Sequence, residues 1–189
     1  LDYLDIFYSH CYDPQTPLEE TASALATAVS QGKALYVGIS SYPSAQTREI
    51  TRLLRQWHVP LIVHQPAYNL FNRWIEQNLL ETCAAQGTGI IAFSTLAQGL
   101  LSGKYTAATP ADKPRASNDQ RELSEQPYAP LAGLEAISLP RGPSLSHMAF
   151  LCVFPFPLVT AWLTLLLPVA HPLYHHPHLA IPSPPPHPP

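Results

Sequence analysis

The chain has 189 residues, a length typical of one domain or of part of a larger one. Hydrophobic residues make up 46% of it, so a packed core is possible and uniform disorder is excluded. The formal net charge is −3 with 10 Lys and Arg residues, so we do not expect a nucleic-acid partner. Three cysteines without metal-ligand spacing favour a reduced, cytoplasmic setting.

The first predicted strand and helix follow directly. Residues 4–9 (LDIFYS) form a short apolar and aromatic run that is typical of a buried parallel strand. Thr16 is placed to cap a helix, and Glu19 completes a capping box. An apolar stripe follows until Gly32 ends the helix, and residues 34–39 (ALYVGI) form the next predicted strand.

The same unit of strand and helix then repeats. Ser44 is placed to cap a second helix, and the strand 60–64 follows it. Asn72 is placed to cap a third helix that Gly87 ends, and the strand 89–93 comes next. The predicted apolar helix faces are Leu18, Ala22, Leu25 and Val29, then Ile50, Leu53, Leu54 and Trp57, and finally Ile75, Leu79 and Cys83. A repeat of about 27 residues indicates parallel strands with helical crossovers.

Two α/β architectures fit this pattern, an open doubly wound sheet and a (β/α)8 barrel. Each of the four strands ends in polar residues, and in a barrel the chemistry collects at that edge of the sheet. No Gly-x-Gly-x-x-Gly follows any of the strands, so the phosphate turn of a Rossmann fold is absent. We therefore predict a partial (β/α)8 TIM barrel.

The composition changes near residue 140. From Gly142 to Pro189 there is no Asp, Glu, Lys or Arg, and thirteen of the 22 prolines lie from Pro140 onward. We therefore expect two parts, a partial barrel over residues 1–148 and an irregular tail over 149–189 that is first apolar and then low in complexity. So abrupt a change fits a frame change or a mis-spliced end.

The uncharged run 149–170 is long enough for a membrane span. Three prolines within it argue against a regular helix and no basic residues flank it closely, so we do not expect a membrane partner. His175, His176 and His178 have poor spacing for a metal site, and no metal is predicted.

The segments at the strand ends resemble the aldo-keto reductase family. LDYLDIFYSH, GKALYVGISSY, HQPAYNLFNRW and FSTLAQGLLSGKY are similar, in order and spacing, to the middle of that family's barrel. The likeness is strongest over residues 1–105. It is greatest to the branch that contains the L-glyceraldehyde 3-phosphate reductases and the potassium-channel beta subunits. It implies strands four to seven of the barrel.

The resemblance implies an NADPH-dependent oxidoreductase that reduces small aldehydes or ketones to alcohols. His10 matches the active-site histidine that orients the substrate carbonyl. Tyr68 matches the aromatic residue that stacks under the nicotinamide ring. The other implied cofactor-binding residues hold the carboxamide (Ser40, Ser41 and Gln65), follow the pyrophosphate (Ser94, Leu96, Gln98 and Gly99) or lie near the phosphates (Lys104 and Arg115).

These residue types suit hydride transfer. The nicotinamide ring and the carbonyl must be held in register, which amide and hydroxyl groups on the carboxamide achieve. Negative charge develops on the carbonyl oxygen, so a hydrogen-bond donor such as His10 must be positioned next to that oxygen. Taken singly, a histidine at a strand end or a tyrosine such as Tyr68 is more often structural, and within the linked set we favour the functional roles. His64 is interpreted as structural.

The family's proton-donating Tyr, the Lys beside it and the Asp paired with that Lys have no match in this sequence. They belong before the strand at residues 4–9. Thr95 stands where the cofactor loop usually has proline, and the family's adenosine-phosphate segment is not found after Leu145. Because the sequence opens in a strand and its only methionine is Met148, we expect a partial chain that is inactive alone.

Two other classes of function stay open. One is a barrel-derived subunit that binds nucleotide or regulates a partner without turnover. The other is a small membrane-attached protein built on the run 149–170. The sequence leaves the substrate and the oligomeric state open.

Overall fold

The computed structural model describes residues 2–103, 128–138, 144–153 and 159–163. These residues form one sheet of five parallel strands in the order β1-β2-β3-β4-β5. The strands are β1 (Leu4–Ser9), β2 (Ala34–Ser40), β3 (Leu61–Gln65), β4 (Gly89–Phe93) and β5 (Val159–Leu163).

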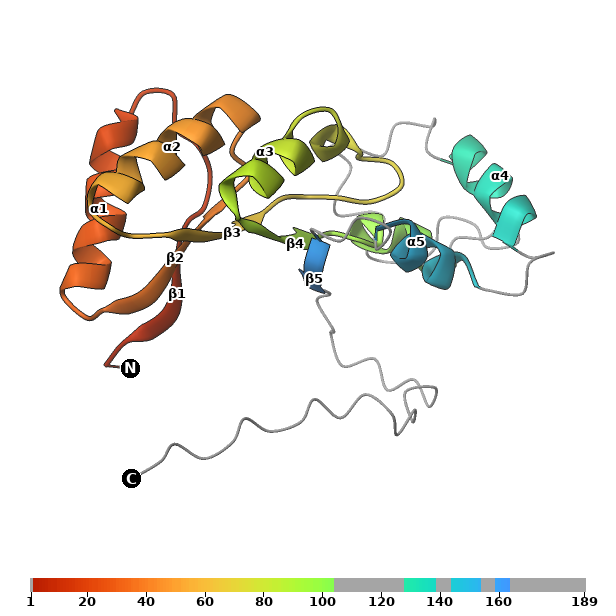
Figure 1. Ribbon diagram of the computed structural model, residues 1–189. Helices are drawn as coiled ribbons and strands as arrows, with labels where there is room; N and C mark the ends of the chain where they lie inside the picture. Colours follow the sequence, from red (N-terminus) through yellow and green to blue (C-terminus); the bar gives the residue numbers. More distant parts are fainter. Residues whose placement is uncertain (1, 104–127, 139–143, 154–158, 164–189) are drawn as a thin grey trace.

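Helices connect the strands. Figure 1 shows α1, α2 and α3 on the same side of the sheet. Their bounds are α1 (Leu18–Ser30), α2 (Ser44–Gln56) and α3 (Leu79–Gln86). The remaining helices are the short 3₁₀ helices η1 (Trp74–Glu76) and η2 (Ala97–Ser102), with α4 (Tyr128–Ser138) and α5 (Leu145–Val153). No helix among the described residues is long and apolar enough to cross a membrane.

The strand order identifies the architecture. Each strand pairs with the strand that follows it in the chain, and the first three helices cover one face only. A doubly wound sheet reverses its strand order at a switch point and carries helices on both faces. A barrel wall winds in one direction with its helices outside. The prediction of a partial (β/α)8 barrel is therefore confirmed.

The fifth strand differs from the prediction. The sequence predicts four strands before residue 105 and an irregular tail after 148, whereas β5 lies within that tail and α5 crosses its start. Residues 159–163 (VTAWL) are uncharged and rich in β-forming types, and β4 otherwise offers them a free edge. Thr160 Oγ1 donates to Ile90 O at 3.1 Å across that pair. His175, His176 and His178 lie outside the described residues.

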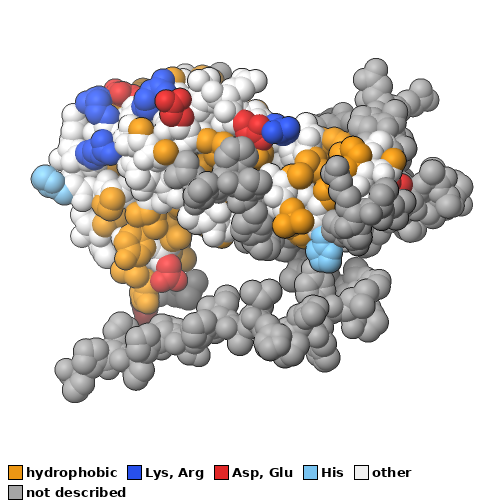
Figure 2. Space-filling model, turned by 45° about the vertical axis from the view of Figure 1, so that its right-hand side comes forward, with side chains coloured by type: hydrophobic (Ala, Val, Ile, Leu, Met, Phe, Trp, Pro, Cys, Tyr) orange, Lys and Arg blue, Asp and Glu red, His pale blue; other side chains and the backbone are white. Residues whose placement is uncertain are grey.

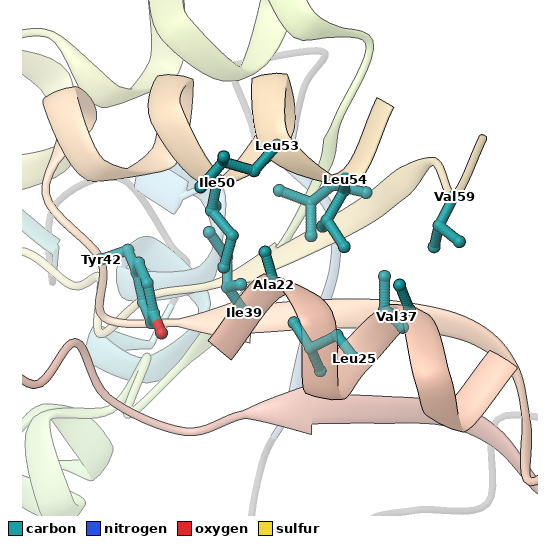
Figure 3. Close-up of a cluster of buried hydrophobic side chains, with 11 residues drawn as sticks. Ala22, Leu25, Val37, Ile39, Tyr42, Ile50, Leu53, Leu54 and Val59 are labelled. Carbon is teal, nitrogen blue, oxygen red and sulfur yellow. The ribbon is translucent and has the colours of Figure 1, made fainter. Parts of the chain in front are cut away.

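The main core lies between the sheet and the first two helices (Figure 3). Val37 and Ile39 of β2 are fully buried against Leu25 of α1 and Leu54 of α2. The apolar face predicted for α1 is therefore confirmed, with Ala22 also buried. Of the face predicted for α2, Trp57 lies just beyond the last residue of the helix and is 44% exposed. Trp57 is therefore not part of this core cluster.

Three helix starts differ from the capping predictions. Thr16 does not cap α1, because its hydroxyl donates to Asp13 Oδ2 at 2.7 Å. Ser44 is the first residue of α2 and makes no capping hydrogen bond. Asn72 is followed by η1, and α3 begins only at Leu79. Gly87 does end α3, in the left-handed conformation.

The face of the sheet away from the helices is closely packed at Gly38. A Cβ atom at this position would lie 2.6 Å from Tyr8 Cε1 and 2.8 Å from Val63 Cγ1. On the same face, apolar side chains of β1 and β2 are open to solvent, among them Leu4 at 43% and Tyr36 at 48%. Figure 2 shows apolar side chains gathered at the end of the molecule that carries β1. The β1 edge is therefore a surface prone to association.

We expect Gly38→Ala to lower the free energy of unfolding by about 1–3 kcal/mol, because a tyrosine ring and a valine methyl must both move. Urea unfolding followed by circular dichroism measures the change. Gly133→Ala is the matched control, since a Cβ there meets nothing within 4 Å inside α4. It should be neutral or stabilising by up to ~1 kcal/mol. Equal effects of the two substitutions would contradict the packing argument.

His64 is a buried titratable side chain on β3. Its Nε2 lies 3.2 Å from Tyr42 N, which donates to it, and 3.1 Å from Tyr42 O. Its Nδ1 is buried and has no hydrogen-bond partner among the described residues. Burial lowers the pKa of His64 from 6.5 to about 4, so the imidazole is neutral near pH 7.

The lowered pKa of His64 makes stability depend on pH. Between pH 6.5 and about pH 4 the unfolded chain binds this proton and the folded chain does not, so stability is lost as the pH falls. Lowering the pH from about 7 to about 4.5 should cost ~2 kcal/mol more in the unaltered chain than in His64→Leu. Urea titrations at both pH values test this. His147→Gln, at an exposed position, is the control, and an unchanged pH dependence in His64→Leu would contradict us.

Candidate functional site

The carboxyl ends of β2, β3 and β4 are joined by hydrogen bonds at one edge of the sheet. Ser40 Oγ donates to Gln65 O at 2.7 Å, and Ser41 N donates to the same oxygen at 3.2 Å. Beyond β3, Phe93 N donates to Pro66 O at 3.0 Å. The structure therefore brings Ser40, Ser41 and Gln65 together, as the sequence predicted.

The two serines present different groups. Ser40 is buried and its hydroxyl is already donated to Gln65 O, so only its lone pairs can accept from a ligand. Ser41 is partly exposed and has a φ of +56°, a left-handed conformation that is strained for a residue with a Cβ. The side chains of Ser41 and Gln65 are thus the more accessible groups predicted to hold a carboxamide.

His10 follows β1 at the same edge and is exposed. Its Nδ1 lies 3.3 Å from Cys11 Sγ, and it makes no other hydrogen bond within the described residues. Nε2 is therefore the ring nitrogen that is open to a substrate oxygen. An imidazole N–H there can stabilise negative charge that develops on a carbonyl oxygen.

Tyr68 does not present a ring face at this edge. Its side chain is 2% exposed, and its hydroxyl donates to Glu76 Oε1 at 2.7 Å. Burial, with the hydrogen bond to Glu76, raises the pKa of Tyr68, and Arg73 in turn pairs with Glu76 at 2.7 Å. The structure therefore shows Tyr68 as a core residue, which does not support the stacking role predicted for it. Phe93, at the end of β4, is an aromatic side chain that stays partly exposed.

The loop after β4 has an unusual backbone. Ser94 and Gln98 have φ values of +54° and +55°, and Gly99 has a φ of +99°. Ser94 O accepts from Ala97 N at 2.8 Å, which closes the turn. Gly99 N donates to Leu96 O at 2.9 Å, so within the described part of the chain the N–H groups of Ser94 and Gln98 are the ones suited to bind an anion. Of the other predicted phosphate contacts, Leu96 is partly buried against η2 and its neighbours, while Lys104 and Arg115 lie outside the described residues.

Two residues of this edge were missed in the sequence analysis. Asn69 Nδ2 donates to Ser94 O at 2.9 Å, so it anchors the loop after β4. Tyr42 is 1% exposed, and its hydroxyl lies 2.7 Å from Ser9 Oγ. The sequence signal was available in both cases, because each is a large or amide-bearing residue within four positions of a strand end.

Two surface hollows among the described residues lie away from this edge. One of about 650 Å³ is lined by α1 residues and Trp57, and one of about 460 Å³ includes Arg55, His58 and Gln86 near the start of β3. Neither contains a predicted site residue. The candidate site is thus an open edge of polar groups, with Ser40, Ser41 and Gln65 joined at its centre.

Solved structures share this fold. A glycerol dehydrogenase from Gluconobacter oxydans superposes with a TM-score of 0.68 at 28% identity, over 86% of this chain and 49% of that one. A thermostable aldo-keto reductase gives a TM-score of 0.58 at 25% identity, over 85% and 49%. Both likenesses cover half of the longer chain.

Sequence relatives agree with the structures. L-glyceraldehyde 3-phosphate reductase of Escherichia coli K12 is 50% identical over 157 residues, 79% of this chain and 45% of the relative. A probable voltage-gated potassium channel subunit beta of Oryza sativa subsp. japonica is 33% identical over 172 residues, 87% of this chain and 52% of the relative. The chain thus spans about half the length of these relatives. The Aldo/keto reductase family model matches residues 1–156, and the chain belongs to that family.

Proposed function

We propose that this chain provides the nicotinamide-facing part of an NADPH-dependent carbonyl reductase site. The observation that carries the proposal is the joined edge of β2 and β3, where Ser40, Ser41 and Gln65 share one carbonyl oxygen as an anchor. A flat, neutral carboxamide is recognised by such fixed amide and hydroxyl groups. The substrate class is a small aldehyde or ketone. L-glyceraldehyde 3-phosphate is the first to test, because the reductase that is 50% identical is named for it.

In this proposal each residue at the edge has one task. The side chain of Gln65 and the hydroxyl of Ser41 hold the carboxamide and so fix which face of the ring is offered. Phe93 takes the place proposed for Tyr68 in the sequence analysis, because its ring is the partly exposed one. The N–H groups of Ser94 and Gln98 face the pyrophosphate, because the Gly99 N–H already donates to Leu96 O at 2.9 Å. NADPH supplies the hydride when bound.

His10 polarises the carbonyl but does not complete the chemistry. Its Nε2 can donate to the carbonyl oxygen, which stabilises the charge that grows as hydride arrives. The alkoxide then needs a proton from a general acid. The family's Tyr and Lys for that step have no match in these 189 residues. We therefore propose that the chain alone binds cofactor weakly and does not turn over substrate, in a cytoplasmic setting.

A second function has its own support. The relative that is 33% identical over 87% of this chain is named as a channel subunit. A barrel wall that holds NADPH without an acid for proton transfer could report nucleotide to a partner protein. NADPH binding without turnover is expected for both functions. An experiment that adds the missing general acid distinguishes between them. A reductase should gain activity from a Tyr and a Lys restored before β1, whereas a nucleotide-binding subunit should not.

Cofactor binding tests the proposal first. We expect the chain to bind NADPH weakly, because no charged side chain after Arg141 is present to pair with the adenosine phosphate. Gln65→Leu should weaken binding by about five- to tenfold, since one neutral hydrogen bond is lost. Gln56→Leu, at an exposed position at the end of α2, is the matched control. Fluorescence titration measures both, and tight binding that Gln65→Leu leaves unchanged would contradict the site.

Turnover is the second test. The 189-residue chain should not oxidise NADPH in the presence of L-glyceraldehyde 3-phosphate or simple aldehydes, because general-acid help is worth ~10²–10⁴-fold and positioning is also incomplete. Loss of NADPH absorbance measures the rate. An enzymatic rate that His10→Ala abolishes and His147→Gln retains would overturn the proposal that the chain is inactive alone.

A further inference from the structure

One buried tyrosine connects three neighbouring strands behind the candidate site. The hydroxyl of Tyr42 lies 2.7 Å from Ser9 Oγ, at the end of β1. Its backbone N–H donates to Nε2 of His64 on β3, and its ring meets the ring of Tyr12 edge to face at 5.7 Å. With 1% of its surface exposed, Tyr42 cannot reach a ligand itself.

Each hydrogen-bonding partner of Tyr42 is the chain neighbour of a predicted site residue. Ser9 precedes His10, and His64 precedes Gln65. Tyr42 itself follows Ser41. Successive side chains of a strand point to opposite faces, so one residue of each strand pair faces the core while the other is free to face a ligand.

The register supports this division. Ser9 pairs with Ile39, and Ile39 pairs with His64. Ile39 belongs to the core beneath the helices, so the network lies on the helix-covered face. Ser40 pairs with Gln65 in the alternate position of the same strands, away from that core. The network therefore lies on the opposite face of the sheet from the site residues and does not itself face a ligand.

We propose that Tyr42 is a positioning residue for the nicotinamide end of the cofactor, an inference that rests on the proposed function. Ser41 is held at a φ of +56°, which persists only where its surroundings fix it. The hydrogen bonds of Tyr42 to His64 and Ser9 supply that fixation on the next residue. Small displacements of a positioned group cause large losses in ligand recognition.

A purely structural role for Tyr42 predicts a different result from a positioning role. Removing a structural hydroxyl lowers stability and weakens all ligands alike. Removing a positioning hydroxyl weakens the contact with the carboxamide in particular. Discrimination between NADPH and its reduced 3-acetylpyridine analogue reports that contact, because the analogue keeps the carbonyl and lacks the amide NH₂.

The test uses the full chain and two variants that break the same hydrogen bond from opposite sides. Tyr42→Phe removes the tyrosine hydroxyl, and Ser9→Ala removes its partner and serves if Tyr42→Phe unfolds. Tyr12→Phe is the matched control, because Tyr12 is the neighbouring tyrosine and its hydroxyl forms no hydrogen bond among the described residues. Fluorescence titrations with NADPH and the analogue give dissociation constants, and urea unfolding confirms that each variant is folded.

We expect Tyr42→Phe and Ser9→Ala to weaken NADPH binding by about fivefold and to leave the analogue within about twofold. The preference for NADPH should then disappear, whereas Tyr12→Phe keeps it. Equal losses for both cofactors, or no loss for either, would overturn the positioning role while the proposed function stands. Absence of any NADPH binding by the unaltered chain would overturn the proposed function and this inference with it.

Discussion

The parallel pairing of β1 to β4 in chain order is the constraint on which the rest of the structure depends. It brings the carboxyl ends of consecutive strands to one edge, and it keeps α1, α2 and α3 on one face. Residues with a core-facing role and residues open to ligand must then alternate along each strand. The carbonyl of Gln65, which accepts from both Ser40 and Ser41, shows the result: the backbone of one strand orders the side chains of its neighbour.

Local sequence patterns were sufficient for most of the fold. The strands at Leu4–Ser9 and Gly89–Phe93 have the predicted bounds, and the apolar stripe of α1 faces the core as its spacing indicated. The misses have nonlocal or competing causes. The Thr16 hydroxyl donates a hydrogen bond to Asp13 instead of capping the helix. The strand β5 pairs with β4, which lies some 70 residues earlier in the chain, and short-range periodicity does not carry that information.

At the candidate site, too, some features follow from the sequence and others depend on the three-dimensional surroundings of a residue. Ser40, Ser41 and Gln65 meet because strand ends meet, which follows from the topology alone. Whether an aromatic ring is exposed depends on its partners. Glu76 accepts a hydrogen bond from the Tyr68 hydroxyl, and Arg73 forms an ion pair with the same carboxylate. These contacts hold Tyr68 in the core. The meeting of the strand ends therefore follows from the sequence pattern, whereas the exposure of the rings beside them does not.

The two aromatic rings at this edge differ in exposure, since Tyr68 is buried and Phe93 is partly exposed. A stacking platform must desolvate on ligand binding, so it needs an open face in the free protein and a fixed orientation. Phe93 ends β4, and its backbone N–H and carbonyl are both bonded, to Pro66 and Tyr68. Tyr68 thus holds the backbone of Phe93 while Phe93 offers the partly open ring. The described residues of this edge accordingly come in pairs, one buried and fixing the backbone, the other partly exposed.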